Sequence, residues 1–295
     1  TLSQAAGGDP FGTQLNDAMI VFERGSRYRI ESNAFTPFFS RRTFADVEFA
    51  VPSGLVDVAP TQPFTMDSLI VRQGVFNLTP SGGCTIRGDI LVYRLATLNL
   101  APRLGPSSVR IGGDAPQRLV GTGTFATGQF PSLVLDNPAG LVLGSNATWR
   151  GAVNFVRGHV HTGGFTFSVD TATVITASQA TGWVNGTLKR TMRYGSASAE
   201  FAVGTDSVYA PVTVSVTGST TEFPLAVSTT DGDHPQLATS GGDPARSVNR
   251  WWTLTPSGAS SFASGSATFT FSAADVDRLA DWNRVSNLDR LTNLN

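Results

Sequence analysis

Apolar and polar residues alternate in short runs along most of the chain, and glycine or asparagine separates the runs. Examples lie at residues 68–71, 75–78, 133–135, 140–143 and 165–169. Alternation with a period of two is typical of β-strands, and strands of this length are not stable alone. Breaks such as those at Gly74 and Gly158 supply the positive φ angles at which a strand turns a corner. The pattern therefore predicts short strands that stack on one another.

Similar strand-turn units recur between residues 64 and 190. They are TIRGDI at 85–90, RLVGTG at 118–123, TWRGAV at 148–153 and WVNGTL at 183–188. Their glycines, Gly88, Gly121, Gly151 and Gly186, follow one another at intervals of 33, 30 and 35 residues. A period of thirty-odd residues lies in the range of solenoid repeats, so we expect a right-handed parallel β-helix. In that stack Ile86, Trp149 and Val184 would form one inward-facing ladder.

The alternative for this region is a β-sandwich of ordinary hairpins. The Asn-Gly and Asp-Gly pairs that close two-residue hairpins are sparse between residues 64 and 190, which favours the solenoid. Residues 1–63 are less regular and predict an N-terminal β cap or the first solenoid turns, because an open solenoid end exposes strand edges.

From residue 191 the alternating runs become longer, as at 199–203, 212–216 and 223–227. Residues 191–295 are therefore predicted to form an antiparallel β-sandwich-like domain with an irregular C-terminal tail. In that tail, Val276, Leu279 and Trp282 are spaced roughly as on a helix, which indicates a short terminal helix.

Composition supports an all-β chain and excludes several classes of function. Charged residues make up only 15% of the 295, the net charge is −1 and the basic residues are scattered, so nucleic acid is not an expected partner. The single cysteine, Cys84, excludes an internal disulfide framework and indicates a small buried apolar residue. No apolar stretch reaches the length of a membrane span. The first residues carry no initiator Met or leader, so we expect a mature product or a fragment.

The order of motifs resembles the repetitive surface and adhesin-like proteins that gliding and related bacteria export by the type IX route. The resemblance depends on four motifs in this order: TWRGAV at 148–153, GTLKR at 186–190, FAVG at 201–204 with YAPV at 209–212, and RWW at 250–252. The resemblance covers roughly residues 64–272, although a recognisable C-terminal sorting domain is missing. It implies a bacterial protein that is extracellular or on the cell surface, a non-catalytic scaffold that polymerises or adheres.

The resemblance also implies O-glycans at Asp-Ser/Thr-aliphatic triplets. The triplets in this chain would carry the glycan on Ser68, Thr171 and Ser207, which makes a glycoprotein the expectation.

Two short motifs carry oxygen or nitrogen ligands for a metal. His159 and His161 lie two positions apart on one strand, so both imidazoles share a face and could reach one ion. Asp231 and Asp233 flank a glycine as in a calcium loop, without the ligand ladder of an EF-hand. A structural or solvated role is the favoured interpretation of both motifs, so we assign no metal site and no cofactor, with Ca²⁺ as the open alternative.

Enzyme and carbohydrate-binding functions are the competing classes. Asp89, Asp114, Asp136 and Asp170 occur about once per turn, as the carboxylates of a polysaccharide-degrading β-helix would, but no nucleophile or phosphate-binding motif accompanies them. The RWW segment could stack on a sugar. Strand alternation places Arg250 and Trp252 on one face and Trp251 on the other, so one tryptophan is expected in the core and the other partly exposed, and a structural role is the favoured interpretation. We therefore expect a rigid structural protein and not an enzyme. Its expected partners are other copies of itself, other surface proteins or glycans.

Overall fold

The computed structural model describes residues 1–5, 22–100, 107–125, 132–258 and 261–277. It is all-β, with 57% strand and 2% helix, and contains a β-solenoid of about eight turns and a later antiparallel region. The predicted fold class is confirmed. The chain divides into two compact units: residues 1–165 with 173–182, and residues 166–172 with 183–295.

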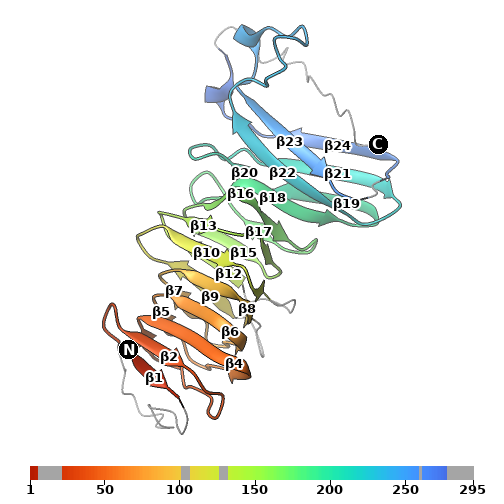
Figure 1. Cartoon of the computed structure of the whole chain (residues 1–295). Coiled ribbons are helices and arrows are strands. Elements are labelled where there is room, and N and C mark those ends of the chain that lie inside the picture. The colour runs from red at the N-terminus through yellow and green to blue at the C-terminus, as the bar shows by residue number, and fades with distance from the viewer. Residues whose placement is uncertain (6–21, 101–106, 126–131, 259–260, 278–295) are drawn as a thin grey trace. The chain divides into compact units, whose positions relative to one another are not determined.

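One face of the solenoid is a sheet of seven parallel strands (Figure 1). They are β3 (Thr43–Phe44), β5 (Phe64–Met66), β7 (Cys84–Ile86), β9 (Ser108–Gly112), β12 (Ser132–Asp136), β15 (Val153–Arg157) and β17 (Ile175–Thr176). Each of these strands pairs in parallel with the strand of the next coil.

The chain alternates between this sheet and a second one. The second sheet contains β1 (Leu2–Gln4), β2 (Arg27–Ile30), β4 (Asp46–Val58), β6 (Leu69–Leu78), β8 (Ile90–Leu100), β10 (Gln117–Gly121), β11 (Thr124–Phe125), β13 (Leu141–Leu143), β14 (Ala147–Trp149) and β16 (Val160–Val169). In the first unit its strands also pair in parallel: β1 with β2, β2 with β4, β4 with β6, β6 with β8, β8 with β10 and β11, β10 with β13, and β13 with β16. Each passage from one sheet to the other therefore adds part of a coil.

The long strands of the second sheet bend at a corner. In β8 the alternating burial is interrupted by three consecutive exposed residues, Tyr93, Arg94 and Leu95. The register of β6 against β8 shifts at the same place. Gly74 occupies this corner in β6 with φ +80°, and a Cβ there would lie 2.2 Å from the carbonyl oxygen of Val51. A coil thus contains three straight segments, two of them within one long strand.

The coil is shorter than the sequence repeats indicated. Cys84 pairs with Phe64 and Val109 pairs with Cys84, so these coils take 20 (84 − 64) and 25 (109 − 84) residues. The predicted period of thirty-odd residues is wrong.

The glycines of the four predicted repeat units occupy different places in the coil. Gly88 precedes β8, Gly121 ends β10, Gly151 lies between β14 and β15, and Gly186 lies within a strand of the second unit. The expected ladder is wrong for the same reason, since Ile86 is in the seven-stranded sheet and Trp149 is not. Of the four glycines only Gly186 has a positive φ, +114°, so they do not share one backbone role in successive coils.

Aromatic rings fill the first coils. Phe39 lies 5.5 Å from Phe64 and Phe49 lies 5.1 Å from Phe76, measured between ring centroids, and all four side chains are buried. These contacts join residues of neighbouring coils, so the core is continuous along the stack.

The second unit consists mainly of antiparallel strands. They are β18 (Val184–Met192), β19 (Gly195–Phe201), β20 (Val203–Gly204), β21 (Val212–Ser219), β22 (Phe223–Asp231), β23 (Arg250–Pro256) and β24 (Ser264–Phe269). β22 pairs with β18 and β23, and β21 pairs with β19 and β24, all antiparallel. Trp252 of β23 and Phe269 of β24 connect the two sheets at a ring-centroid distance of 4.9 Å. The expected antiparallel region is present.

Two short 3₁₀ helices interrupt the second unit, η1 (Pro244–Arg246) and η2 (Ala273–Asp275). Val276 follows η2, whereas Leu279 and Trp282 of the expected terminal helix lie outside the described residues. Within the described ranges no helix has the length and apolar character needed to cross a membrane.

Candidate functional site

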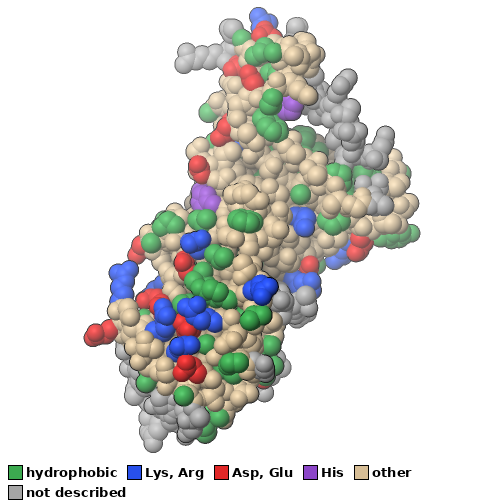
Figure 2. Space-filling model, viewed as in Figure 1, with side chains coloured by type: hydrophobic (Ala, Val, Ile, Leu, Met, Phe, Trp, Pro, Cys, Tyr) green, Lys and Arg blue, Asp and Glu red, His purple; other side chains and the backbone are tan. Residues whose placement is uncertain are grey.

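Three arginines surround the carboxylate of Glu48 on β4, which is only 2% exposed. Arg27 Nη1 and Arg72 Nε each donate to it at 2.8 Å, and Arg29 Nε lies 3.3 Å away. The hydrogen bond to Glu48 raises the pKa of Arg72, whose guanidinium also lies 4.9 Å from the Tyr93 ring centroid. Because these side chains come from β2, β4, β6 and β8, the cluster joins successive coils. Figure 2 shows acidic and basic side chains intermixed over the lower part of the molecule in that view.

Asp136 is the centre of a second ion-pair cluster. It is 7% exposed and accepts hydrogen bonds from Arg110 of β9 and from Arg157 of β15, the latter at 2.5 Å. The hydrogen bond from Arg157, followed by that from Arg110, lowers the pKa of Asp136 against the opposite effect of burial. Asp89, another of the once-per-turn carboxylates, accepts the backbone N–H of Arg118 at 2.8 Å. These two carboxylates make structural contacts between coils.

An amide ladder runs along a further row. Asn99 of β8 donates to Asn77 of β6 at 2.5 Å, and Asn77 donates to the carboxylate of Asp57 on β4. Both hydrogen bonds point toward Asp57, so the ladder polarises toward the negative charge and stabilises it.

A groove of about 720 Å³ lies at the Asp57 end of this ladder. Its apolar lining includes Pro37, Phe38 and Pro60, and its polar lining includes Asp57, Thr61 and Thr79. The Phe38 ring is half-buried and lies under the guanidinium of Arg42, at 5.2 Å from the ring centroid. A volume of this size is typical of small-ligand sites, and an aromatic ring beside a fixed carboxylate suits a ligand with both apolar and hydroxyl faces.

His159 and His161 lie close together at the start of β16. Their ring centroids are 5.9 Å apart and their planes are perpendicular. Val160 and Thr162 are fully buried, so the alternation of the strand directs both imidazoles outward. In the described part of the chain, no group of three or more His, Cys, Asp or Glu side chains could hold a metal ion.

The two acidic residues of the expected calcium loop have separate partners. Asp231, at the end of β22, forms an ion pair with Arg250 Nη2 at 2.5 Å and accepts from the Thr205 hydroxyl at 3.1 Å. Asp233 accepts from the Ser247 hydroxyl at 2.6 Å. Each carboxylate is therefore already bound by neighbouring side chains of the second unit.

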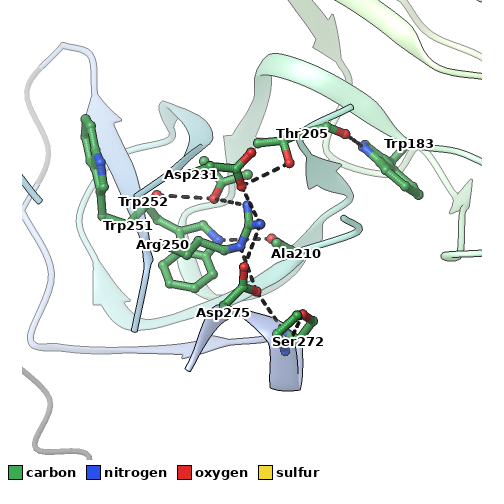
Figure 3. A network of polar contacts seen from close by, with 11 residues as sticks. Trp183, Thr205, Ala210, Asp231, Arg250, Trp251, Trp252, Ser272 and Asp275 are labelled. Atoms are coloured by element: carbon green, nitrogen blue, oxygen red, sulfur yellow. Dashed lines mark hydrogen bonds and ion pairs between the residues drawn. The ribbon is translucent and has the colours of Figure 1, made fainter. Parts of the chain in front are cut away.

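Arg250 is the centre of the polar network in Figure 3, where it lies between Asp231 and Asp275. Its side chain is 0% exposed and donates to Asp275 through Nε at 3.1 Å and Nη2 at 3.0 Å. Burial alone would raise the pKa of Asp275, but the hydrogen bonds from Arg250 and from the Ser272 backbone outweigh it, and the pKa is lowered. A guanidinium enclosed in this way cannot serve as a fork for a sugar.

The tryptophans beside Arg250 differ in their surroundings. Trp252 Nε1 donates to the carbonyl oxygen of Ala210 at 2.9 Å, and Trp251 points the opposite way in Figure 3 and packs edge-on against His234 at 5.1 Å. Arg250 and Trp252 therefore make contacts within the second unit.

The three expected glycosylation residues lie at turns. Ser68 is half-buried between β5 and β6, Thr171 is half-buried after β16, and Ser207 is exposed between β20 and β21. Their modification stays a prediction.

No protein-family model, curated protein or solved structure matches the chain. Its function therefore has to be argued from its own geometry.

Sequence reasoning missed Glu48 and Asp57. Their hydrogen-bond partners are 20 to 24 residues away, about one coil. That separation becomes a useful signal only when the coil length is known.

Proposed function

We propose that the chain is an extracellular structural protein, a cell-surface or filament-forming subunit that acts as a rigid scaffold or adhesive stalk. The observation that supports this proposal is the way in which outward-facing polar side chains connect coils in the first unit. Glu48, Asp136 and the ladder of Asp57, Asn77 and Asn99 all bridge neighbouring coils.

Such contacts stiffen a stack because each coil is held by its core and also by its surface. A solenoid coil contacts only its neighbours, so stiffness depends on these nearest-neighbour terms. A scaffold uses this property directly, since it has to keep a length and present its ends or faces. No internal ligand is needed for that role.

The proposal is tested by locating the chain and by imaging it. Antibody labelling of intact cells of the producing bacterium is expected to mark the surface, and electron microscopy of purified protein is expected to show assemblies that grow with concentration. Removal of residues 1–17, which takes away the terminal strand β1, is expected to reduce assembly. Recovery of the chain only from the cytosol, or monomers at every concentration, would count against the proposal.

A carbohydrate-binding surface module is the second candidate, and the groove beside Asp57 favours it. Phe38 offers a half-buried aromatic face, and Asp57 offers an acceptor oriented by Asn77. Sugar rings combine an apolar face with hydroxyl donors, which this pairing would satisfy.

A glycan array tests this second candidate. Binding to a defined set of oligosaccharides is expected, and Phe38→Ala is expected to abolish it. Phe35 is 44% exposed and does not line the groove, so Phe35→Ala is the matched control and should bind normally. Equal loss in both variants would exclude the groove as the site.

A further inference from the structure

The two outward imidazoles of β16 form the strongest ligand arrangement outside the groove, and we infer that His159 and His161 together chelate a divalent late transition metal ion, of the Cu²⁺, Ni²⁺ or Zn²⁺ class. This inference is independent of the proposed scaffold function. It rests on the spacing of the rings, on how the strand is held and on the donor chemistry.

The spacing of the rings is close to that of a chelate. With metal–nitrogen bonds of about 2.0–2.1 Å, two imidazoles on one tetrahedral ion place their ring centroids roughly 5 Å apart. The observed separation is 5.9 Å, with perpendicular rings. Rotation of one or both side chains has to close the remaining difference of about 1 Å between the ring centroids.

The backbone under the pair is held in place by the neighbouring coil. The backbone N–H of Leu141 donates to the carbonyl oxygen of His159 at 2.9 Å, and His161 pairs with Val142 in the parallel register. Val160, between the two histidines, is 0% exposed and anchors the strand in the core. A chelate on a fixed strand loses little backbone freedom when it binds, which favours affinity.

The neighbouring coil also leaves room for the rings. Gly140 lies beside His161, and a Cβ at that position would be 2.9 Å from Cδ2 and Nε2 of the imidazole. Any other residue at 140 would therefore displace the ring, and Gly140 also has φ +82°.

The donor set selects the class of metal. Neutral imidazole nitrogen suits zinc, copper and nickel, whereas calcium and magnesium prefer oxygen ligands. Two protein ligands leave positions on the ion for water or for a donor from another molecule. The site is thus an exchangeable surface chelate and not a closed structural site.

The chain offers an internal control, because it has three histidines in total and the third, His234, lies in the second unit and packs against Trp251. The experiment is titration of the tag-free full chain with Ni²⁺ or Cu²⁺ by isothermal calorimetry, with electron paramagnetic resonance of the Cu²⁺ complex to count nitrogen ligands. One ion per chain with two nitrogen ligands is the expected result. His159→Gln and His161→Gln are each expected to weaken binding at least tenfold, and His234→Gln is expected to leave it unchanged.

A second variant separates loss of the site from loss of the fold. Gly140→Ala keeps both histidines but is expected to weaken binding, and circular dichroism melts of every variant identify any that unfold. No binding by the parent chain, equal binding by all three histidine variants, or loss caused by His234→Gln would overturn the inference.

Discussion

The buried ion pair of Arg250 gives the sharpest test of the energetics. Arg250 Nη2 lies 2.5 Å from Asp231 and 3.0 Å from Asp275, so distance alone ranks the pair with Asp231 first. Burial ranks them the other way, because the side chain of Asp231 is 58% exposed and that of Asp275 is 10% exposed. We therefore expect the buried ion pair with Asp275 to contribute more to stability than the exposed ion pair with Asp231.

The magnitudes follow from that difference. Arg250→Met keeps an apolar stem but leaves Asp275 as an uncompensated buried charge, which costs about 3–5 kcal/mol. Asp231→Asn removes an exposed partner and is expected to cost less than about 1 kcal/mol. Arg246→Met is the matched control, since Arg246 is 64% exposed and its carboxylate partner Asp243 is 3.6 Å away.

Urea unfolding followed by tryptophan fluorescence measures these costs. Trp183, Trp251 and Trp252 lie in the second unit, whereas Trp149 lies in the first. All variants are therefore made in a Trp149→Phe background, so that the signal reports on the unit that contains Arg250. With a urea m-value of about 2 kcal/mol/M, a loss of about 4 kcal/mol lowers the midpoint by about 2 M. An Asp231→Asn variant as destabilised as Arg250→Met, or an Arg250→Met variant as stable as Arg246→Met, would contradict the dominant role of burial.

Three further predictions concern the dependence of stability on pH, the reactivity of the Cys84 thiol and a glycine at a corner of the solenoid. The pKa of Asp275 is lowered in the folded state, so its carboxylate stabilises the fold fully above the unfolded pKa of about 3.9, and this stabilisation is lost as the pH falls through the folded pKa. Asp275→Asn should therefore flatten the dependence of unfolding free energy on pH below about pH 4. An unchanged pH dependence would contradict this. Burial raises the pKa of Cys84 to about 12, so Ellman's reagent at pH 8 is expected to react only after denaturant is added, and prompt reaction would show the thiol to be accessible. Gly158→Ala places a Cβ 1.9 Å from the Asn137 carbonyl oxygen at φ +91° and is expected to cost more than about 2 kcal/mol in thermal or urea unfolding, against about 1 kcal/mol for Gly163→Ala, where no atom lies within 4 Å.

Local pattern was enough to predict the class of fold but not the length of the coil. Alternation and glycine breaks are local properties, and they correctly indicated short stacked strands and a buried Cys84. The coil length is a property of residues that face each other, and it was readable in a different repeat. VDVAP at 56–60, FNLTP at 76–80 and LNLAP at 98–102 recur after 20 and 22 residues, and they contain Asp57, Asn77 and Asn99 of the amide ladder.

The candidate sites show the same limit. The proximity of His159 and His161 follows from strand alternation alone, so the sequence predicts it. The three arginines around Glu48 come from coils before and after it, and only the correct register brings them together. Contacts between side chains of adjacent coils cannot be predicted from the local spacing of residues, because the partners are about one coil apart in the sequence.

The corners of the solenoid have a practical consequence. Cys84 pairs in register with Phe64 on one side and Val109 on the other although the two coils take 20 and 25 residues, so coil length can change while the ladder is kept. Peptide segments inserted at such corners should extend into solvent and leave the ladders intact. The first unit would then serve as a display frame, on which epitopes or binding loops can be grafted one above another at the spacing of adjacent strands, about 4.8 Å.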